Sequence, residues 1–374
     1  MIRRMTNRRV LTDAPLLDAA AGRTPSRRPV WFMRQAGRSL PEYREIRANI
    51  GMLESCFRPD LLAEITMQPV RRHDVDAAIL FSDIVVPLKA AGVDLDIVPG
   101  RGPVVAHPVR TAADIDALPG FDPDQVAAVV EGIGAILGEL TDRQALIGFA
   151  GAPFTLASYL IEGGPSRNHE RTKALMHSEP ALWDRLMSRI DPLITGFLRA
   201  QIDAGVDAVQ LFDSWAGFLT ERDYRRHVLP HSARILGAIA DAGVPRIHFG
   251  VGTGELLGAM AAAGTEVVGV DWRMPLDIAA RRISAALQDD DPADGRGDSA
   301  RALQGNLDPA ILFAGESAVQ AEVRRILAEA DRAIDRGDAR GHIFNLGHGV
   351  LPDTDADAIT RTVDFVHAQP PAPR

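Results

Sequence analysis

One pattern recurs along most of the chain and constrains its fold more than any other feature. A short apolar run ends in glycine or a polar residue, and a longer amphipathic stretch follows. The pattern occurs eight times in 374 residues, with apolar runs at Val30–Met33, Ala77–Phe81, Ala145–Phe149, Ala208–Phe212, Arg246–Phe249, Val267–Val270, Ala302–Gln304 and His342–Leu346. Continuous apolar runs of this length are typical of strands buried on both faces, as in parallel sheets.

The stretches between these runs carry apolar residues at three- and four-residue spacing, which predicts helices. The clearest helices are expected over Asp60–Val70, Val126–Leu140, Pro180–Ala204, Tyr224–Asp241, Leu276–Leu287 and Ser317–Asp335. Eight strand–helix units favour a closed (β/α)8 barrel, the TIM-barrel form of an α/β fold, over an open doubly wound sheet. We therefore expect one catalytic barrel domain over residues 29–367.

The two ends of the chain and one internal segment are expected to lie outside the barrel. Residues 1–28 are predicted to form a partly disordered N-terminal extension, with a short helix between Pro15 and Ala21. Residues 368–374 are rich in proline and are predicted to be a disordered tail. The segment Asp289–Ser299 carries five Asp and one Arg together with Pro and Gly, so we interpret it as a solvated loop and not as a metal site.

Composition excludes several classes of protein. A net charge of −9 argues against general nucleic-acid binding, so an anionic ligand would need a local basic patch. The single cysteine, Cys56, excludes an intrachain disulfide and sites built from several thiolates, which fits a cytoplasmic protein. The first ten residues hold four Arg with no apolar run after them, unlike a secretory signal. The uncharged stretch Gln144–Ile161 is interrupted by glycines and a proline, so we expect no membrane span.

The loop after the first apolar run provides such a basic patch. Between Gly22 and Arg47 the chain holds seven Arg and two Glu, a local charge of +5. Ser39 and Glu42 have the spacing of a capping box, so a helix is expected to start at Pro41 and to leave Arg34 and Arg38 in the loop. Paired guanidinium groups at the end of a barrel can bind carboxylates in bidentate fashion.

Other strand ends offer further candidates. Asp83 follows the second run, where a buried carboxylate needs a cation or N–H donors, and the nearby arginines are expected to lower its pKa and keep it ionised. His348 lies between two glycines after the eighth run, which favours a role in binding over one in the core.

Three further patterns are rejected as sites. His227 and His231 have the i, i+4 spacing of a helical metal site, but Pro230 intervenes and no acidic residue has metalloprotease spacing, so we assign both to structure. The run Gly250–Gly254 is followed by Glu255 where a dinucleotide fingerprint requires glycine or alanine. The P-loop and the nucleophile-elbow patterns are also absent from the sequence. No organic cofactor is therefore expected.

Several of these segments resemble one family. Pro29-Val30-Trp31-Phe32-Met33-Arg34-Gln35-Ala36-Gly37-Arg38 is similar to the N-terminal signature of the uroporphyrinogen decarboxylase family. Further matches are Phe81-Ser82-Asp83-Ile84, Gly148–Leu156 with Tyr159 and Glu162-Gly163, Phe212–Gly217 and Asn345–Gly349, so the resemblance covers residues 28–353. It implies a (β/α)8 barrel, usually a homodimer, that works without a metal or an organic cofactor.

The resemblance also implies a substrate and a set of site residues. The substrate would be uroporphyrinogen III, a cyclic tetrapyrrole with eight carboxylates, of which four acetate carboxyls are removed as CO2 to give coproporphyrinogen III on the route to haem. Asp83 would face the pyrrole N–H groups, and Arg34 is the family's usual candidate for delivering a proton. The substrate-binding residues would be Arg34, Gln35, Ala36, Gly37, Arg38, Asp83, Tyr159, Ser214 and His348, with Arg47 as an addition from the following helix.

Two alternatives stay open from the sequence. One is a cobalamin- or thiol-dependent methyltransferase of the same fold, whose zinc site uses His and Cys ligands together. Cys56 is expected in the first helical region, away from the strand ends, and a single cysteine cannot supply two thiolates. The other is a tetrapyrrole carrier without catalysis, which the presence of both Asp83 and Tyr159 disfavours. The proton donor is also open between Arg34, a bound water and a carboxylic acid of the substrate.

Overall fold

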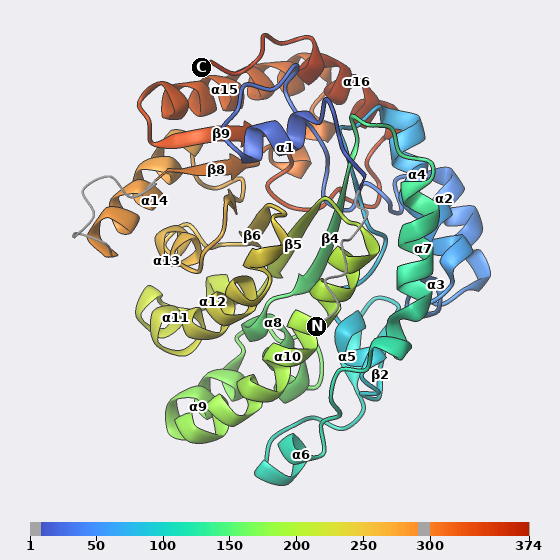
Figure 1. Ribbon diagram of the computed structural model, residues 1–374, viewed down its shortest axis with the longest axis vertical. Helices are drawn as coiled ribbons and strands as arrows, with labels where there is room; N and C mark the ends of the chain where they lie inside the picture. Colours follow the sequence, from blue (N-terminus) through green and yellow to red (C-terminus); the bar gives the residue numbers. More distant parts are fainter. Residues whose placement is uncertain (1–8, 291–299, 374) are drawn as a thin grey trace.

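A computed structural model describes residues 9–290 and 300–373 of the protein. At its centre lies a curled sheet of seven parallel strands (Figure 1). In spatial order these are β1 (Ala77–Ile79), β4 (Ala145–Gly151), β5 (Ala208–Asp213), β6 (Arg246–Gly250), β7 (Val267–Gly269), β8 (Arg301–Gln304) and β9 (Ala339–Ile343). Every residue of β1, β4 and β7 is buried, as their continuous apolar runs predict. A separate antiparallel pair joins β2 (Leu95–Val98) to β3 (Gly102–Val105).

The run Val30–Met33, predicted as the first strand, forms a single bridge instead of a strand. Val30 pairs in parallel with Phe344, and the Phe344 N–H donates to the Pro29 carbonyl over 2.8 Å. On the other side, the Asp76 N–H donates to the Val30 carbonyl over 2.9 Å. The Val30 N–H donates to the Asp76 carboxylate over 2.8 Å, so a side chain takes the place of a ladder partner. The described sheet therefore has seven strands, one fewer than the sequence predicts.

Helices surround this sheet (Figure 1). The α-helices are α1 (Pro15–Ala20), α2 (Pro41–Ile46), α3 (Met52–Cys56), α4 (Pro59–His73), α5 (Val86–Ala90), α6 (Ala112–Asp116), α7 (Ala127–Leu137), α8 (Pro153–Glu162), α9 (Glu170–Ser178), α10 (Pro180–Ala204), α11 (Glu221–His227), α12 (Leu229–Ala238), α13 (Leu257–Ala262), α14 (Leu276–Asp290), α15 (Glu316–Asp335) and α16 (Ala356–His367). Short 3-10 turns are η1 (Arg47–Asn49), η2 (Pro123–Val126), η3 (Ala216–Phe218), η4 (Ala240–Ala242) and η5 (Pro309–Phe313).

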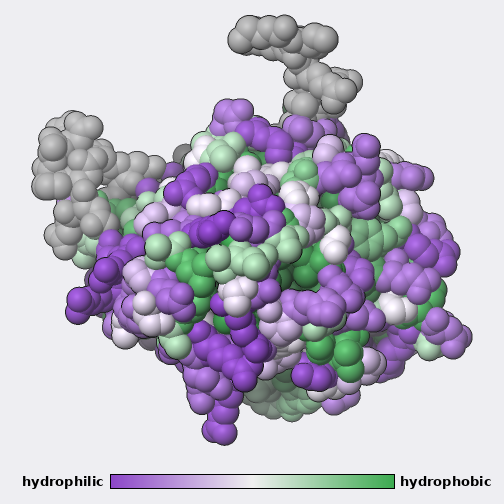
Figure 2. Space-filling view, turned by 90° about the horizontal axis from the view of Figure 1, so that it is seen from below, coloured by the Kyte–Doolittle hydropathy of each residue, from purple (hydrophilic) through white to green (hydrophobic). Residues whose placement is uncertain are grey.

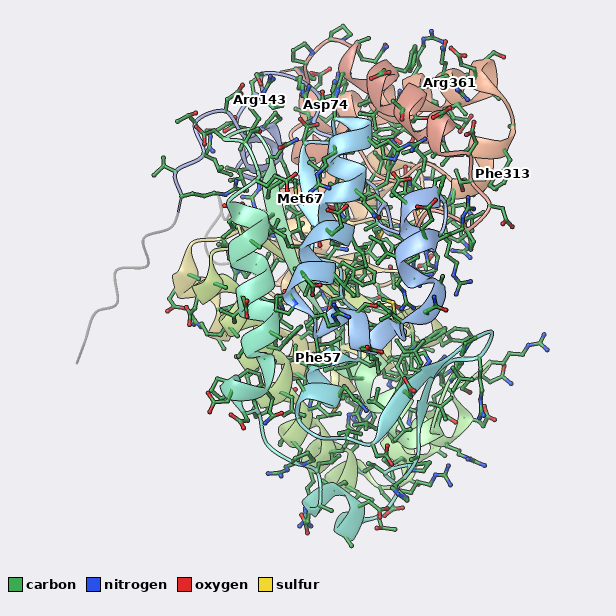
Figure 3. The ribbon with its side chains drawn as sticks, turned by 90° about the vertical axis from the view of Figure 1, so that its right-hand side faces the viewer. Phe57, Met67, Asp74, Arg143, Phe313 and Arg361 are labelled. Carbon is green, nitrogen blue, oxygen red and sulfur yellow. The ribbon has the colours of Figure 1, made fainter. Side chains whose placement is uncertain are left out.

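Most of the expected helices are confirmed, and one is divided. The helix expected over Tyr224–Asp241 is split at Val228 into α11 and α12, with η4 after them. Pro230 lies in the first turn of α12, where its missing N–H is tolerated, and α11 ends before it. On another side of the molecule α4 and α7 lie next to each other, with Met67 of α4 buried (Figure 3).

The two terminal segments meet near the edge of the sheet. The expected short helix is confirmed as α1, which packs against β8 and β9 with Leu16 fully buried. Arg28 pairs with Asp331 over 2.7 Å, and its Nε donates to the Pro370 carbonyl over 2.6 Å. Residues 368–373, for which the sequence predicts disorder, therefore contact the segment that precedes the first apolar run. The expected acidic loop falls largely on residues 291–299, outside the described residues.

Polar and apolar residues are interspersed over the face of the molecule in Figure 2. In the described part of the chain, no helix combines the length and the apolar character needed to cross a bilayer. The uncharged stretch Gln144–Ile161 instead forms β4 and most of α8, as its glycines and proline predict.

Candidate active site

The predicted site residues follow strands that end at the same edge of the sheet. Because the seven strands are parallel, their carboxyl ends lie together, and loops from several of them meet there. Asp83 follows β1, Ser214 follows β5 and His348 follows β9, while Tyr159 lies on α8 directly after β4. The segment that bridges β9 and β1 leads into Arg34 and Arg38.

Arg34 has an unusual backbone conformation. Its φ of 59° lies in the left-handed region, which non-glycine residues adopt at a cost. The residues beside it hold it there: the Met33 N–H donates to Asn345 Oδ1 over 3.0 Å, and the Val350 N–H donates to the Met33 carbonyl over 2.8 Å. The loop after β9 therefore fixes the direction in which Arg34 leaves the sheet.

Gln35 and Gly37 shape the same loop from within. The fully buried Gln35 accepts the Phe32 N–H at Oε1 over 2.9 Å and donates from Nε2 to the Ala77 carbonyl over 3.0 Å. Both ends of its amide thus bind backbone, which ties the loop to β1. A Cβ at Gly37 would lie 2.8 Å from the Arg34 carbonyl oxygen, so this position requires glycine. Ala36 between them is half-buried.

The side chain of Arg34 packs over a glycine and reaches the other predicted groups. A Cβ at Gly349 would lie 2.7 Å from Arg34 Cγ, so the arginine stem occupies the space that Gly349 leaves open. Its positive charge acts on Asp83, Tyr159 and His348. Arg34 and Arg38 are exposed, and neither pairs with a carboxylate among residues 9–290 and 300–373. Two guanidinium groups without an ion-pair partner among the described residues thus stand at this edge.

Asp83 lies in surroundings that oppose its ionisation. Its Oδ1 accepts the Val85 N–H over 3.0 Å. Burial raises the pKa of the Asp83 carboxyl, while this N–H and the charge of Arg34 act in the opposite direction with smaller effects. The prediction that the arginine loop lowers this pKa is therefore wrong, because loss of solvent outweighs the arginine. A carboxylate held this way attracts any positive charge that approaches it.

Tyr159 and Ser214 are linked through Trp215. The rings of Tyr159 and Trp215 meet edge to face with centroids 6.0 Å apart. Burial and the neighbouring Asp83 raise the pKa of Tyr159 to about 12, so its hydroxyl stays protonated and able to donate. Ser214 precedes Trp215 and is half-buried. The structure thus brings both predicted residues to one corner of the site.

His348 is held as a neutral hydrogen-bond donor. Burial, Arg34 and Arg273 lower its pKa to about 4, so the imidazole is uncharged at neutral pH. Its Nδ1 accepts the Gly349 N–H over 2.6 Å, which leaves the proton on Nε2. His348 can therefore donate from Nε2 to an anionic oxygen.

Arg47 lies in η1 and has partners within the protein. Its guanidinium donates to the Ile50 carbonyl and, over 3.0 Å, to Ser55 Oγ. The helix before it, α2, starts at Pro41 as expected, but its N-cap is Leu40 and no side chain caps it. The predicted capping box of Ser39 and Glu42 is therefore wrong: Ser39 is buried, while Glu42 pairs with Arg72.

With this geometry described, comparison with known proteins identifies the family. A sequence model described as uroporphyrinogen decarboxylase (URO-D) matches residues 11–369. The chain belongs to the uroporphyrinogen decarboxylase family. A uroporphyrinogen decarboxylase of Corynebacterium diphtheriae is 69% identical over 94% of this chain and 98% of its own length. Another from Rhodococcus erythropolis is 68% identical over 96% of this chain and 97% of its own length.

Solved structures of other enzymes show a similar fold. A methyltransferase from Methanosarcina mazei superimposes with a TM-score of 0.74 and covers 96% of this chain and 98% of its own. A B12-independent methionine synthase from Shewanella superimposes with a TM-score of 0.52 over 82% of this chain and 87% of its own. Because these chains are 17% and 11% identical to this one, the likeness concerns the fold alone.

Cys56 lies closer to the site of this family member than the sequence predicts. It ends α3 and is fully buried, its thiol donates to the Met52 carbonyl over 3.3 Å, and the charge of Asp83 acts on it. Burial and the charge of Asp83 raise the pKa of the thiol far above its usual range. The expectation that Cys56 lies away from the strand ends is therefore wrong, because η1 and α3 bring the chain back to the end of β1.

We predict that this thiol resists alkylation in the folded protein. Its burial and raised pKa leave little accessible thiolate, so iodoacetamide should react at least about a hundredfold more slowly than after unfolding in urea. Mass spectrometry of samples taken over time measures both rates. Equal rates in the folded and unfolded protein would contradict the burial of Cys56 beside Asp83.

Arg273, which follows β7, is a residue near His348 that was not predicted from the sequence. Its guanidinium lies 3.9 Å from the centre of the Trp272 ring and pairs with Asp271 over 2.6 Å. The Trp272 ring in turn lies 6.1 Å from that of His348. Its position after a strand is the feature of the sequence that could have marked Arg273 as a site residue, but nothing in the sequence shows which residues it contacts.

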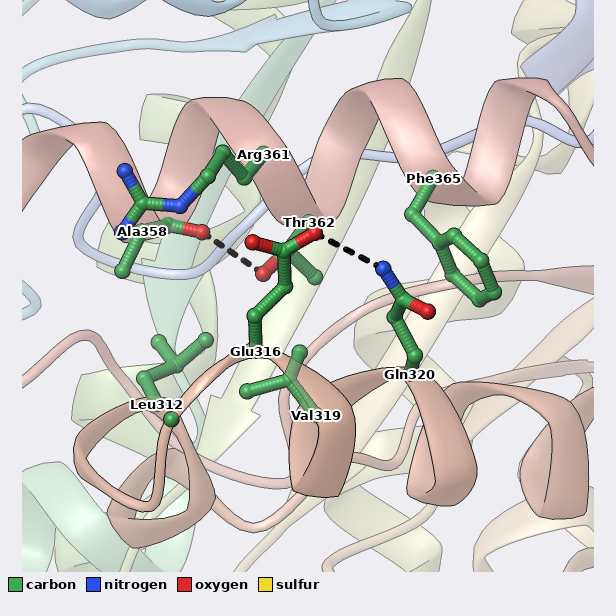
Figure 4. Close-up of a pocket in the computed structure, with 9 residues that line it drawn as sticks. Leu312, Glu316, Val319, Gln320, Ala358, Arg361, Thr362 and Phe365 are labelled. Atoms are coloured by element: carbon green, nitrogen blue, oxygen red, sulfur yellow. Dashed lines mark hydrogen bonds between the residues drawn. The ribbon is translucent and has the colours of Figure 1, made fainter.

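Two other features of the structure lie apart from these residues. A hollow between α15 and α16 is lined by Leu312, Val319, Glu316, Arg361, Phe365 and four neighbours (Figure 4). None of the predicted site residues of the uroporphyrinogen decarboxylase family lines it. Among the described residues, the group of three side chains that could hold a metal ion is His177, Asp223 and His227, which also contains none of them.

Proposed function

We propose that this chain decarboxylates uroporphyrinogen III, removing its four acetate carboxyl groups as CO2 to give coproporphyrinogen III. The observation that carries this proposal is that two exposed arginines without an ion-pair partner among the described residues, Arg34 and Arg38, lie at the same edge of the sheet as the carboxyl of Asp83. The arginines suit a substrate with many carboxylates, and Asp83 suits its pyrrole N–H groups. Membership of the uroporphyrinogen decarboxylase family supports the same substrate.

The chemistry of decarboxylation explains why the carboxyl group of Asp83 is needed in the site. An acetate attached to a pyrrole through CH2 cannot lose CO2 directly, because the electrons of the broken bond have no acceptor. Protonation of the adjacent ring carbon gives an iminium-like cation that accepts these electrons as CO2 leaves. A proton then adds to the remaining methylene carbon to give the methyl group, and the ring carbon loses the proton that it gained. We infer that Asp83, as the carboxylate, hydrogen-bonds the ring N–H groups and stabilises this cation, an effect of about 3 kcal/mol for a group fixed in advance.

The surrounding residues would hold the substrate's carboxylates. Arg34 and Arg38 provide charged donors, while Tyr159, Ser214 and the Nε2 of His348 provide neutral ones. Binding energy from the distant carboxylates would then position the reacting acetate. Gln35, Ala36 and Gly37 would act through the shape of the loop, and Arg47 would require release from Ile50 and Ser55 to reach the substrate.

We also propose a closed barrel, a homodimer and a cytoplasmic location. Hydrogen bonds that join the Pro29–Trp31 segment to Phe344, directly after β9, and to Asp76, directly before β1, support a sheet that closes around this segment. The single cysteine supports a reducing compartment. Sedimentation equilibrium would test the dimer, for which a mass of twice 40.3 kDa is expected.

The deciding experiment is a dark, anaerobic incubation of the protein with freshly reduced uroporphyrinogen III and EDTA. Chromatography by carboxyl number should then resolve products with seven, six, five and four carboxyl groups. Unchanged substrate in the presence of tight binding would instead indicate a carrier. Activity that appears only after a corrinoid or a metal is added would favour a methyltransferase of this fold.

Arg38 offers a test of carboxylate recognition. Arg38→Lys keeps the charge but removes the planar pair of donors, so we expect KM to rise about tenfold with kcat within about twofold of the unsubstituted enzyme. Initial rates of CO2 release over a range of substrate concentrations measure both constants. An unchanged KM would assign Arg38 to the surface and not to the substrate.

A further inference from the structure

The structure brings together three metal-binding side chains that are distant in the sequence. His177 lies near the end of α9, while Asp223 and His227 lie one turn apart on α11. One ligand atom from each lies within 4.8 Å of those of the other two. His177 Nε2 is 3.6 Å from Asp223 Oδ2, and the two imidazole rings have centroids 5.7 Å apart.

This grouping differs from the histidine pair that the sequence shows. His227 and His231 are spaced as neighbours on one helix, but the break at Val228 separates them into α11 and α12. His231 is buried and pairs through Nδ1 with Asp191 over 2.8 Å. His227 remains in the uninterrupted turn that carries Asp223, where i and i+4 side chains share one face. The assignment of His231 to structure agrees with its contacts, whereas His227 faces another partner.

We propose that His177, Asp223 and His227 form a binding site for a divalent transition metal, with Zn²⁺ as the representative ion. Two imidazoles and one carboxylate match the ligands that zinc, nickel, copper and cobalt prefer, whereas magnesium and calcium prefer oxygen ligands. Water would complete the coordination. This proposal is independent of the proposed decarboxylation.

The geometry allows the three groups to close on an ion. Ligands at 2.0–2.1 Å from a tetrahedral zinc lie about 3.4 Å from one another, which is shorter than the outer limit of 4.8 Å found here. The side chain of His177 is 54% exposed and can rotate to make up the difference. The backbone of His227 is anchored, because the Trp183 indole N–H donates to its carbonyl over 2.9 Å, and its side chain is buried. One mobile ligand thus faces a fixed one.

The charged groups around His227 have both signs. Arg226 acts on His227 as a positive neighbour with the largest charge effect, and Asp223 and Asp184 oppose it as negative neighbours. The Asp223 carboxylate adds the negative charge that partly neutralises the ion.

A bound metal would join two helices that frame the segment with Ser214. At the start of α9, the ring of His169 lies 5.0 Å from that of Trp215 and 4.7 Å from that of Phe218. The metal would add a second connection between α9 and the segment that runs from Ser214 into α11, this time at His227. We therefore expect binding to raise the melting temperature of the protein.

The test uses full-length protein without a histidine tag, treated with EDTA and desalted. Zn²⁺ is titrated in competition with a chromophoric chelator, and one equivalent should bind. His177→Ala and Asp223→Asn should each weaken binding at least about tenfold, since each removes one of three ligands. His107→Ala is the matched control, because His107 is an exposed histidine outside the group, and it should bind as the unsubstituted protein does.

Two further readouts separate coordination from nonspecific binding. Co²⁺ in place of Zn²⁺ should give visible absorption bands that His177→Ala weakens, and Zn²⁺ should raise the melting temperature of the unsubstituted protein more than that of Asp223→Asn. Circular dichroism confirms that both variants are folded. The absence of a stoichiometric site, or equal affinities in the unsubstituted protein and both variants, would overturn the proposal.

Discussion

Replacing Asp83 with alanine is expected to leave a folded protein whose kcat is lower by a factor of about a hundred or more. The carboxyl group is the anion expected to face the substrate ring, and loss of a preorganised charge of this kind costs about 3 kcal/mol of transition-state stabilisation. Its burial raises its pKa, so the ionised form is poorly solvated before the ring cation develops. Asp83→Asn should lose a similar factor, because an amide keeps the shape but not the charge.

The control for Asp83 is another aspartate that caps a turn after a strand. Asp308 follows β8, and its Oδ1 accepts the Ala310 N–H over 2.9 Å, as Asp83 accepts the N–H of Val85 over 3.0 Å. Asp308→Ala therefore removes the same kind of hydrogen bond without removing the central carboxyl, and its kcat should stay within about twofold. Single-turnover CO2 release measures each variant. A normal kcat in folded Asp83→Ala would remove Asp83 from the mechanism.

The strands and most of the helices could be predicted because apolar patterns report burial directly. The continuous apolar run of β4 is buried most readily as a strand covered on both faces. The heptad-like spacing of apolar residues in α10 is buried most readily as one face of a helix. The strand predicted at Val30–Met33 does not form, for a reason that the apolar pattern of the sequence cannot show. Asp76, distant in sequence, supplies its carboxylate to the Val30 N–H, and only one bridge forms with Phe344.

The candidate site could be predicted as a set of residues but not as a set of interactions. The resemblance named Asp83 and Arg34, yet the direction of the Asp83 pKa shift depends on burial, which the sequence does not give. The same holds for Cys56, because the return of α3 toward β1 is a tertiary contact. His348 shows what the structure adds, since the Gly349 N–H determines which ring nitrogen carries the proton.

Substitution of Arg34 is expected to have the second large effect on activity. Substitution of Gly349 tests how the Arg34 side chain is positioned. Arg34→Ala removes the charge that reaches Asp83, Tyr159 and His348, and we expect kcat/KM to fall at least about a hundredfold, as for loss of a charged hydrogen-bonding partner. Gly349→Ala places a methyl group 2.7 Å from Arg34 Cγ. The arginine must then leave its place, so kcat/KM should fall at least about tenfold.

A double substitution distinguishes displacement of Arg34 from general damage to the loop. If Gly349→Ala acts through the arginine stem, adding it to Arg34→Ala should cost almost nothing further, since the group that it displaces is already gone. Gly120→Ala is the control, because a Cβ at Gly120 has no neighbour within 4 Å. Rates of CO2 release from the four proteins of the cycle give the coupling directly. Losses that simply multiply would show that Gly349 and Arg34 act independently, and the close approach of the two residues would then have no part in holding the guanidinium at the site.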